Sequence, residues 1–232
     1  MSSSHHAYGL FHLGWLAGIV GLSIALSLLC RKGLVRHQYV RAALICLLVA
    51  GELQRYFKDG VAFPNHLPLN LCNITTWVAV LACLRLYPIA VEFTYFAGLA
   101  GAGMALITPD MGSEWPIRFF MNHGALIVTA SALVFGRIAP LGELAYRHAC
   151  VCTLLYCGFV GVFDWAFKTN FAYLRSKPGV TTLLTAFGPW PYYIFGMIAI
   201  AFLIYWLLWQ PVRPRKAERE AIPGAVRSTA SA

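Results

Sequence analysis

Charged side chains are scarce in this sequence, because Asp, Glu, Lys and Arg make up only 12% of its 232 residues while hydrophobic residues make up 59%. Acidic residues are the rarer kind, with 9 Asp and Glu against 18 Lys and Arg. Soluble domains carry about 25% charged residues. Together with a mean hydropathy of +0.65, this composition excludes an ordinary soluble protein and predicts an integral membrane protein.

The N-terminus lacks the features of a cleavable signal peptide. No Lys or Arg precedes the first apolar run, and no A-x-A cleavage site follows it. Both features are typical of a secretory signal peptide, so the first run is predicted to remain as a membrane span. Internal repeats and separate domains are also missing from the sequence. Residues 1–8 are interpreted as an N-terminal tail, and 211–232 as a disordered basic cytoplasmic tail that has charge but no hydrophobic period.

Seven apolar windows of roughly 20 residues are long enough to cross a bilayer. They lie at 9–30, 39–58, 67–87, 89–107, 117–136, 146–167 and 190–210. The fourth is rich in glycine, which predicts close helix packing. Because every backbone polar group in hydrocarbon must be satisfied within its own segment, the predicted fold is all-α. It is a polytopic membrane protein with a single bundle of seven transmembrane helices over residues 9–210.

The basic residues are distributed unevenly between the two sides of this predicted bundle. With the N-terminus outside, 12 of the 18 lie in inner segments and 6 in outer segments. The positive-inside rule therefore favours an external N-terminus and a cytoplasmic C-terminus. Much of the net charge of +9 lies in the 31–41 segment and the 211–232 tail, where it can contact anionic lipid. Membrane lipids are thus the predicted partners, nucleic acid is not needed, and the oligomeric state is left open.

Metal-binding spacing is absent from the seven cysteines, which lie almost all inside apolar spans. Cys150 and Cys152 are separated by one residue and have no accompanying ligand set for zinc. A buried cysteine usually packs as a small hydrophobic residue. We therefore predict no metal and no cofactor.

Polar residues concentrate in three segments that the predicted topology places on the outer side. The first is the stretch FPNHLPLNLCN at 63–73, the second leads to MNH at 121–123, and the third runs from 164 to 193. Pro68 is predicted to begin the third span and Pro116 the fifth, since proline suits the first turn of a helix. Cys72 then lies one turn inside its helix, where the helix dipole favours a thiolate, and His123 lies at a similar depth.

A thiol and an imidazole at the same depth can act together as the nucleophile and the general base that nucleophilic acyl transfer requires. Cys72 is the predicted nucleophile and His123 the predicted base. If this interpretation is right, the Cys72 sulfur and a His123 ring nitrogen should lie within about 4 Å or be bridged by one water. Taken alone, however, a cysteine in an apolar span is more often a packing residue, and a single histidine is more often an interfacial residue.

The remaining polar and aromatic residues of these segments are candidates for substrate binding. The amides could stabilise an oxyanion, and Lys177 could bind a lipid phosphate as a point charge. The predicted substrate-binding set is His66, Asn70, Asn73, Asn122, Asn170, Tyr173, Lys177, Trp190 and Tyr192. Trp190 and Tyr192 can equally be read as part of an aromatic belt at the membrane interface. The long connection from 164 to 191 is predicted to fold back as a short helix or re-entrant segment over the bundle.

Four stretches in this order carry a family resemblance: HLPLNLCNI (66–74), FFMNH (119–123), NFAYLRSKP (170–178) and GPWPYYI (188–194). Over residues 45–210 the chain is similar to the YwaF-like family of bacterial integral membrane proteins. That family looks related to the eukaryotic transmembrane protein 164, a cysteine-dependent lipid acyltransferase. The resemblance implies that Cys72 matches the nucleophile and His123 its paired histidine.

The leading hypothesis is therefore a membrane lipid acyltransferase or acyl hydrolase that works at the extracytoplasmic side of a bacterial inner membrane. Its nucleophile would be Cys72 and its base His123. The alternative is a non-enzymatic lipid-binding protein or a small-molecule transporter, in which the same polar residues recognise a headgroup.

Overall fold

The computed structural model describes residues 9–60, 62–108, 116–177 and 186–214, and within these ranges the regular structure is entirely helical. The elements are α1 (Leu10–Arg31), α2 (His37–Asp59), α3 (Leu71–Arg85), α4 (Pro88–Ala97), the π-helical turn η1 (Gly98–Ala102), α5 (Gly103–Ile107), α6 (Pro116–Val134), α7 (Ala145–Phe167), the 3₁₀ turn η2 (Phe171–Tyr173) and α8 (Tyr192–Trp209). Since α4, η1 and α5 are continuous, the described residues form one long helix for each of the seven predicted spans. The predicted all-α fold is confirmed.

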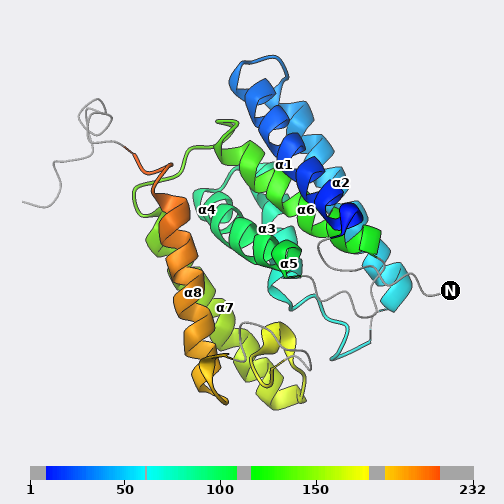
Figure 1. Ribbon diagram of the computed structural model, residues 1–232, viewed down its shortest axis with the longest axis vertical. Coiled ribbons are helices and arrows are strands. Elements are labelled where there is room, and N and C mark those ends of the chain that lie inside the picture. Colours follow the sequence, from blue (N-terminus) through cyan, green and yellow to red (C-terminus); the bar gives the residue numbers. More distant parts are fainter. Residues whose placement is uncertain (1–8, 61, 109–115, 178–185, 215–232) are drawn as a thin grey trace, which may run out of the picture.

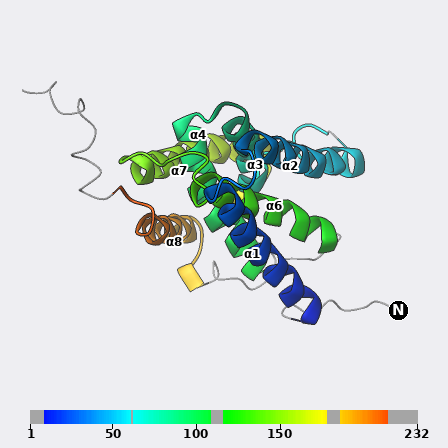
Figure 2. The ribbon, with the colours of Figure 1, turned by 90° about the horizontal axis from the view of Figure 1, so that it is seen from above.

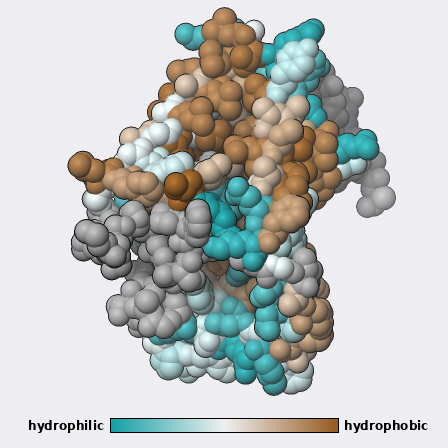
Figure 3. Space-filling model, turned by 90° about the vertical axis from the view of Figure 1, so that its right-hand side faces the viewer, coloured by the Kyte–Doolittle hydropathy of each residue, from teal (hydrophilic) through white to brown (hydrophobic). Residues whose placement is uncertain are grey.

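Five of these helices are long and apolar enough to cross a membrane: α1, the Pro88–Ile107 helix, α6, α7 and α8. The α3 helix is apolar but has only 15 residues. The α2 helix has 23 residues, and its final turns carry Glu52, Arg55 and Lys58. The chain is therefore a multi-pass membrane protein. Hydrophobic side chains cover much of the upper part of the face in Figure 3, with hydrophilic side chains at its top edge and across its middle.

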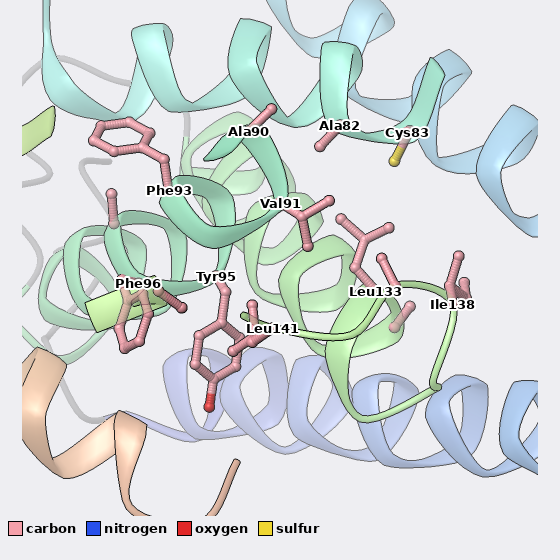
Figure 4. Packing of buried hydrophobic residues seen from close by; sticks show 14 of the residues in the cluster. Ala82, Cys83, Ala90, Val91, Phe93, Tyr95, Phe96, Leu133, Ile138 and Leu141 are labelled. Carbon is pink, nitrogen blue, oxygen red and sulfur yellow. The ribbon is translucent and has the colours of Figure 1, made fainter. Parts of the chain in front are cut away.

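The helices are arranged with α1 and α2 on one side and α7 and α8 on the other, and α3, α4 and α6 lie between them (Figures 1 and 2). The α1 helix packs on α6, α2 packs on α3, and α7 packs on both α4 and α8. Figure 4 shows side chains of α3, α4 and the α6–α7 connection meeting in the core between them. In the glycine-rich span, a Cβ on Gly101 would lie 3.4 Å from the Leu71 side chain, an ordinary van der Waals contact. The predicted need for glycine in the packing of this span stays a prediction.

Contacts between helix termini define two ends of the bundle. At one end, Arg41 near the start of α2 donates from Nη2 to the carbonyl of Leu84 in the last turn of α3, at 2.8 Å. This end also carries the 31–41 segment, and we call it the basic end. At the other end, Nε2 of His12 donates to the carbonyl of Leu106 at 2.8 Å, which joins the start of α1 to α5. This second end carries residues 62–74, residues 168–177 and the first turns of α3, α6 and α8, and we call it the site end.

Two predicted boundaries at the site end are wrong. The α3 helix begins at Leu71 rather than at Pro68, so Cys72 is its second residue and does not lie one turn inside it. The side chains of other helices explain this start, because Tyr156 donates to the Leu69 carbonyl at 2.8 Å and Arg55 donates to the His66 carbonyl at 3.1 Å. The connection to α8 begins at Lys168 rather than at 164, because α7 ends at Phe167, which is the end of the predicted 146–167 window. In contrast, α6 begins at Pro116 as predicted.

The predicted limits of the N-terminal tail, of the 9–210 membrane domain and of the C-terminal tail stay predictions. Residues 1–8 and 215–232 lie outside the described residues.

Candidate functional site

A buried carboxylate organises one half of the site end. Glu52 is only 4% exposed although it lies near the end of a membrane helix. Its Oε2 accepts from Nε of Arg55, one turn later on α2, at 3.1 Å, and its Oε1 accepts from Nδ2 of Asn73 at 2.7 Å. Asn73 directly follows Cys72, so this carboxylate anchors the first turn of α3 to α2.

The same carboxylate lines a small cavity of about 10 Å³, together with Thr76, Asn122 and the apolar side chains of Leu47, Leu48 and Ala125. This volume suits a single water molecule, and the carboxylate, hydroxyl and amide groups provide polar partners for one. Asn122 reaches the cavity because α2 has a glycine opposite it: a Cβ on Gly51 would overlap the Asn122 side chain. Asn73 and Asn122, which were predicted from separate loops, therefore converge on Glu52. We call Glu52, Arg55, His66, Asn73 and Asn122 the Glu52 cluster.

Two nitrogen atoms of this cluster are buried without a hydrogen-bond partner within the part of the chain that the structure describes. They are Nη2 of Arg55 and Nδ1 of His66. The two residues are adjacent in space, because Nη1 of Arg55 donates to the backbone carbonyl of His66. A buried unsatisfied polar atom is costly and needs a physical explanation, such as a ligand or a water molecule. The Glu52 cluster thus has polar capacity that its own side chains do not use.

The second half of the site end is built on Asp164, which is 1% exposed in the last turn of α7. Its Oδ1 accepts from the Thr169 hydroxyl at 2.7 Å and from the Phe171 N–H at 3.0 Å. These bonds turn the chain back over the end of α7 and form η2. Phe171 and Leu174 are then buried against Tyr156 and Val160. Residues 168–177, which we call the return segment, contain only the three-residue 3₁₀ turn η2. Residues 178–185 lie outside the described residues, and the predicted short helix or re-entrant segment stays a prediction.

The return segment is held over the start of α3 and α8 by long-range bonds. The Ala172 N–H donates to Oδ1 of Asn70 at 3.1 Å. The Tyr193 hydroxyl donates to the Tyr173 carbonyl at 2.5 Å, and Nε1 of Trp190 donates to the Leu174 carbonyl at 3.2 Å. Ala172 and Tyr173 have positive φ angles of 51° and 57°, a conformation that non-glycine residues adopt only when surrounding contacts impose it.

The remaining predicted substrate-binding residues lie in or beside the return segment. Nζ of Lys177 lies 5.4 Å from the centre of the Tyr193 ring, a cation–π arrangement. The Asn170 amide is engaged within the segment, where its Oδ1 accepts from the N–H groups of Arg175 and Ser176 and its Nδ2 donates to Ser176. Tyr192 begins α8 and is 66% exposed. Their roles in substrate binding stay predictions.

Cys72 lies between these two halves and is half-buried. On one side it packs against the apolar cluster that contains Leu48, Ala125 and Leu126, next to the Glu52 cluster. On the other side, Asn70, two residues before Cys72, accepts a bond from the Ala172 N–H of the return segment. The N-cap residue of α3 is Asn70, whose side chain bonds to Ala172 and makes no capping hydrogen bond to the helix. The first-turn N–H groups of α3 lie outside the intrahelical ladder and direct the positive end of the helix dipole toward this thiol.

His123 lies at the start of the third turn of α6 and is also half-buried. Its Nδ1 lies 2.8 Å from the Phe119 carbonyl, and its ring packs on the Phe119 ring with centroids 4.3 Å apart. A carbonyl can only accept, so Nδ1 carries the proton and Nε2 is left as the basic nitrogen. Ala125 and Leu126, which follow His123 on α6, belong to the apolar cluster on which Cys72 packs. The pairing of Cys72 and His123 as a dyad stays a prediction.

The sequence analysis did not identify Tyr156 as a site residue. It also gave Glu52, Arg55 and Asp164 no role in the site. Tyr156 stands in an apolar run, CTLLYCGF, that gives no sign of its contact with the 66–74 stretch. For Glu52 and Asp164 a signal existed, because a carboxylate inside a membrane span is by default a functional candidate. Among the described residues, no group of three or more His, Cys, Asp and Glu side chains is placed to hold a metal ion.

Comparison with known proteins gives one match. The model of the TMEM164 family matches residues 1–209, which include every predicted site residue. Neither a curated protein nor a solved structure matches the chain. The predicted relation to transmembrane protein 164 is confirmed, whereas the narrower assignment to YwaF-like bacterial proteins stays a prediction.

Proposed function

The chain belongs to the TMEM164 family, and we propose that it is a lipid acyltransferase or acyl hydrolase with Cys72 as nucleophile and His123 as base. The observation that carries this proposal is the position of Cys72. Cys72 is the second residue of α3, next to Asn73, which bonds to Glu52, and two residues after Asn70, which bonds to the return segment. We further propose that the protein resides in a bacterial inner membrane with the site end outside and the basic end in the cytoplasm.

The short length of α3 supports a substrate that enters from the membrane. A helix of 15 residues spans about 22 Å, roughly 8 Å less than the hydrocarbon core of a bilayer. We propose that this shortfall lies at the N-terminus of α3. Cys72 would then lie at the border between headgroups and hydrocarbon, which is the depth of the ester groups of a phospholipid.

The proposed reaction begins when Nε2 of His123 accepts the proton of the Cys72 thiol. The thiolate attacks the ester carbonyl of a donor phospholipid, and the first-turn N–H groups of α3 stabilise the oxyanion. The tetrahedral intermediate collapses to a thioester on Cys72, while the leaving alkoxide takes the proton from the imidazolium and departs as a lysophospholipid. The imidazole then deprotonates an acceptor alcohol or water, whose oxygen attacks the thioester, and the thiolate regains the proton.

Each half of the site end has its own task in this scheme. The Glu52 cluster holds the start of α3 in place through the bond from Asn73 to Glu52. The return segment covers the opposite side of Cys72 and limits the access of water, which favours transfer over hydrolysis. Tyr156, which bonds to the chain just before α3, fixes the distance between α7 and the nucleophile.

A covalent intermediate is the first expected result. Purified protein mixed briefly with a phospholipid donor and quenched in acid should gain the mass of one acyl chain, and peptide analysis should place it on Cys72. Cys157 provides a matched control, because it is a second half-buried cysteine near the site end. The Cys157→Ala variant should still gain the acyl chain, whereas Cys72→Ala should not.

Two outcomes count against the proposal. An acyl adduct that persists in Cys72→Ala would place the nucleophile elsewhere. Stable binding of phospholipid without any adduct or lysophospholipid product, under conditions where the protein is folded, would favour the lipid-binding alternative.

Replacing Lys177 with alanine is expected to raise KM for an anionic phospholipid about tenfold or more and to leave kcat nearly unchanged. A lost charge-assisted bond to a phosphate weakens binding of substrate and transition state alike. Lys168→Ala is the matched control, because Lys168 lies in the same segment and its Nζ also faces an aromatic ring, that of Trp165 at 5.7 Å. Equal changes in the two variants, or a fall in kcat alone, would contradict a headgroup role for Lys177.

A further inference from the structure

A groove far from the site end runs between α1 and α6 and has a volume of about 350 Å³. This volume is in the range of small-molecule sites, about 300–1,000 Å³. Its walls include Val20, Ile24 and Leu28 of α1, and these three side chains are 48–57% exposed. Because α1 packs mainly on α6 among the described elements, the groove has no third helix over it and opens sideways from the bundle. In a membrane it faces acyl chains.

The groove is strongly cationic where it reaches the basic end. Arg31, the last residue of α1, lines it there. Lys32 and Arg36 follow in the connection to α2, and no Asp or Glu precedes Glu52 in the whole chain. Among the described residues at this end, the acidic ones are Glu143 and Glu92, which is buried against His148 at 2.7 Å. Glu218 and Glu220 follow α8 in a basic stretch that lies outside the described residues. Charge complementarity therefore favours an anionic group at the Arg31 end of the groove.

Hydroxyl groups form the polar part of the groove wall below this cationic end. Ser23, Ser27 and Ser131 all line it, and each is 7% exposed. Ser23 bonds to the carbonyl of Ile19 in its own helix, as serines in membrane helices commonly do. The Ser27 hydroxyl has no hydrogen-bond partner within the described ranges. Ser27 precedes Arg31 by four residues, so its hydroxyl lies about 6 Å deeper along the helix.

We propose that this groove binds one anionic phospholipid from the leaflet at the basic end, with its phosphate at Arg31 and one acyl chain along Ile24 and Val20. The order of chemical groups along the groove matches the order of groups in a phospholipid. A cation lies where the phosphate would bind, hydroxyls follow at the depth of the ester carbonyls, and apolar side chains follow at the depth of the acyl chains. This site lies at the opposite end from Cys72 and is separate from the proposed catalytic lipid. It gives the protein a dependence on the charge of the leaflet at its basic end.

The test measures lipid retention by native mass spectrometry on the full chain purified in detergent. Phosphatidylglycerol or phosphatidylcholine of identical acyl chains is added at equal concentration. We expect one phosphatidylglycerol to be retained at least about fivefold more than phosphatidylcholine, the effect of one basic residue near an anionic headgroup. Arg31→Gln should lower this preference to near one. Arg36→Gln, which removes the same charge at the same end but does not line the groove, should keep it.

A second pair of variants tests the groove itself. Ile24→Trp adds bulk to a groove residue that is 57% exposed, and Val162→Trp adds it to a residue of α7 that is 68% exposed and lies outside the groove. Only Ile24→Trp should reduce retention of phosphatidylglycerol. Equal losses in Arg31→Gln and Arg36→Gln would overturn the proposal in favour of diffuse attraction. Full retention in Ile24→Trp, or a dimer that Ile24→Trp dissociates, would also overturn it.

The outcome of this test does not depend on the proposed acyl transfer. Cys72→Ala is expected to retain phosphatidylglycerol as the unmodified chain does, even though it forms no thioester. Loss of lipid in Cys72→Ala would show that the retained lipid occupies the site end and would overturn the assignment to the α1–α6 groove.

Discussion

Replacing Cys72 with alanine is expected to reduce acyl transfer to the background of the uncatalysed reaction, because the substitution removes the atom that forms the thioester. Replacing His123 with glutamine is expected to slow transfer about 10²–10⁴-fold, the usual contribution of a general base. Glutamine keeps the size and polarity of the side chain but cannot take up the thiol proton. The measurement is the initial rate at which a labelled acyl chain moves from phospholipid to lysophospholipid in detergent micelles.

The effects of these two substitutions on the rate of acyl transfer should not be additive. Residues that act as one unit give a double variant that is no slower than the worse single variant, so Cys72→Ala with His123→Gln should match Cys72→Ala alone. Cys157→Ala, the control on α7, should transfer at nearly the rate of the unmodified chain. A His123→Gln variant that retains more than half the rate would remove His123 from the mechanism, even if Cys72 remained the nucleophile.

The helices could be predicted from the sequence because hydropathy acts locally. A run of about 20 apolar residues has few alternatives to a membrane helix. Pro116 marked one boundary correctly for the same reason, because α6 begins at this residue. These signals need no knowledge of what each helix contacts.

The boundaries that were predicted wrongly depend on contacts between residues far apart in the chain. The start of α3 is set by Tyr156 and Arg55, which bind the carbonyls of Leu69 and His66. The end of α7 is set by Asp164, whose buried carboxylate accepts bonds from the return segment. Neither interaction leaves a periodic pattern in the sequence, so Pro68 and the polar residues after position 164 suggested other limits.

The candidate site was predictable in composition but not in arrangement. Its asparagines and histidines were identified because polar residues are conspicuous beside apolar spans. Their division into two halves was not, since it depends on which of them faces α2 and which faces α7. Asn73 joins Glu52 on α2, while Asn70, three residues earlier, bonds to Ala172 of the return segment. The intervening Cys72 is placed between the halves by these two opposed anchors.

The Glu52 anchor leads to the second large effect, which concerns stability. Replacing Glu52 with alanine is expected to destabilise the protein by about 3–5 kcal/mol, the cost of removing one partner of a buried ion pair. Arg55 would keep its charge in a largely buried place, where Nη2 already has no partner among the described residues. Asn73 would also lose the acceptor of its side-chain amide. Thermal unfolding of the purified protein in detergent measures the change.

Two further variants separate charge from hydrogen bonding in this prediction. Glu52→Gln keeps an acceptor for Asn73 but loses the charge opposite Arg55, so it should be less destabilising than Glu52→Ala. Glu52→Leu combined with Arg55→Leu removes both charges, and an apolar pair in place of a buried ion pair is often neutral or stabilising. The double variant should therefore unfold at a higher temperature than Glu52→Ala. If it is instead the least stable of the three, the cluster stabilises the fold through the bond from Arg55 to the His66 carbonyl rather than through the ion pair.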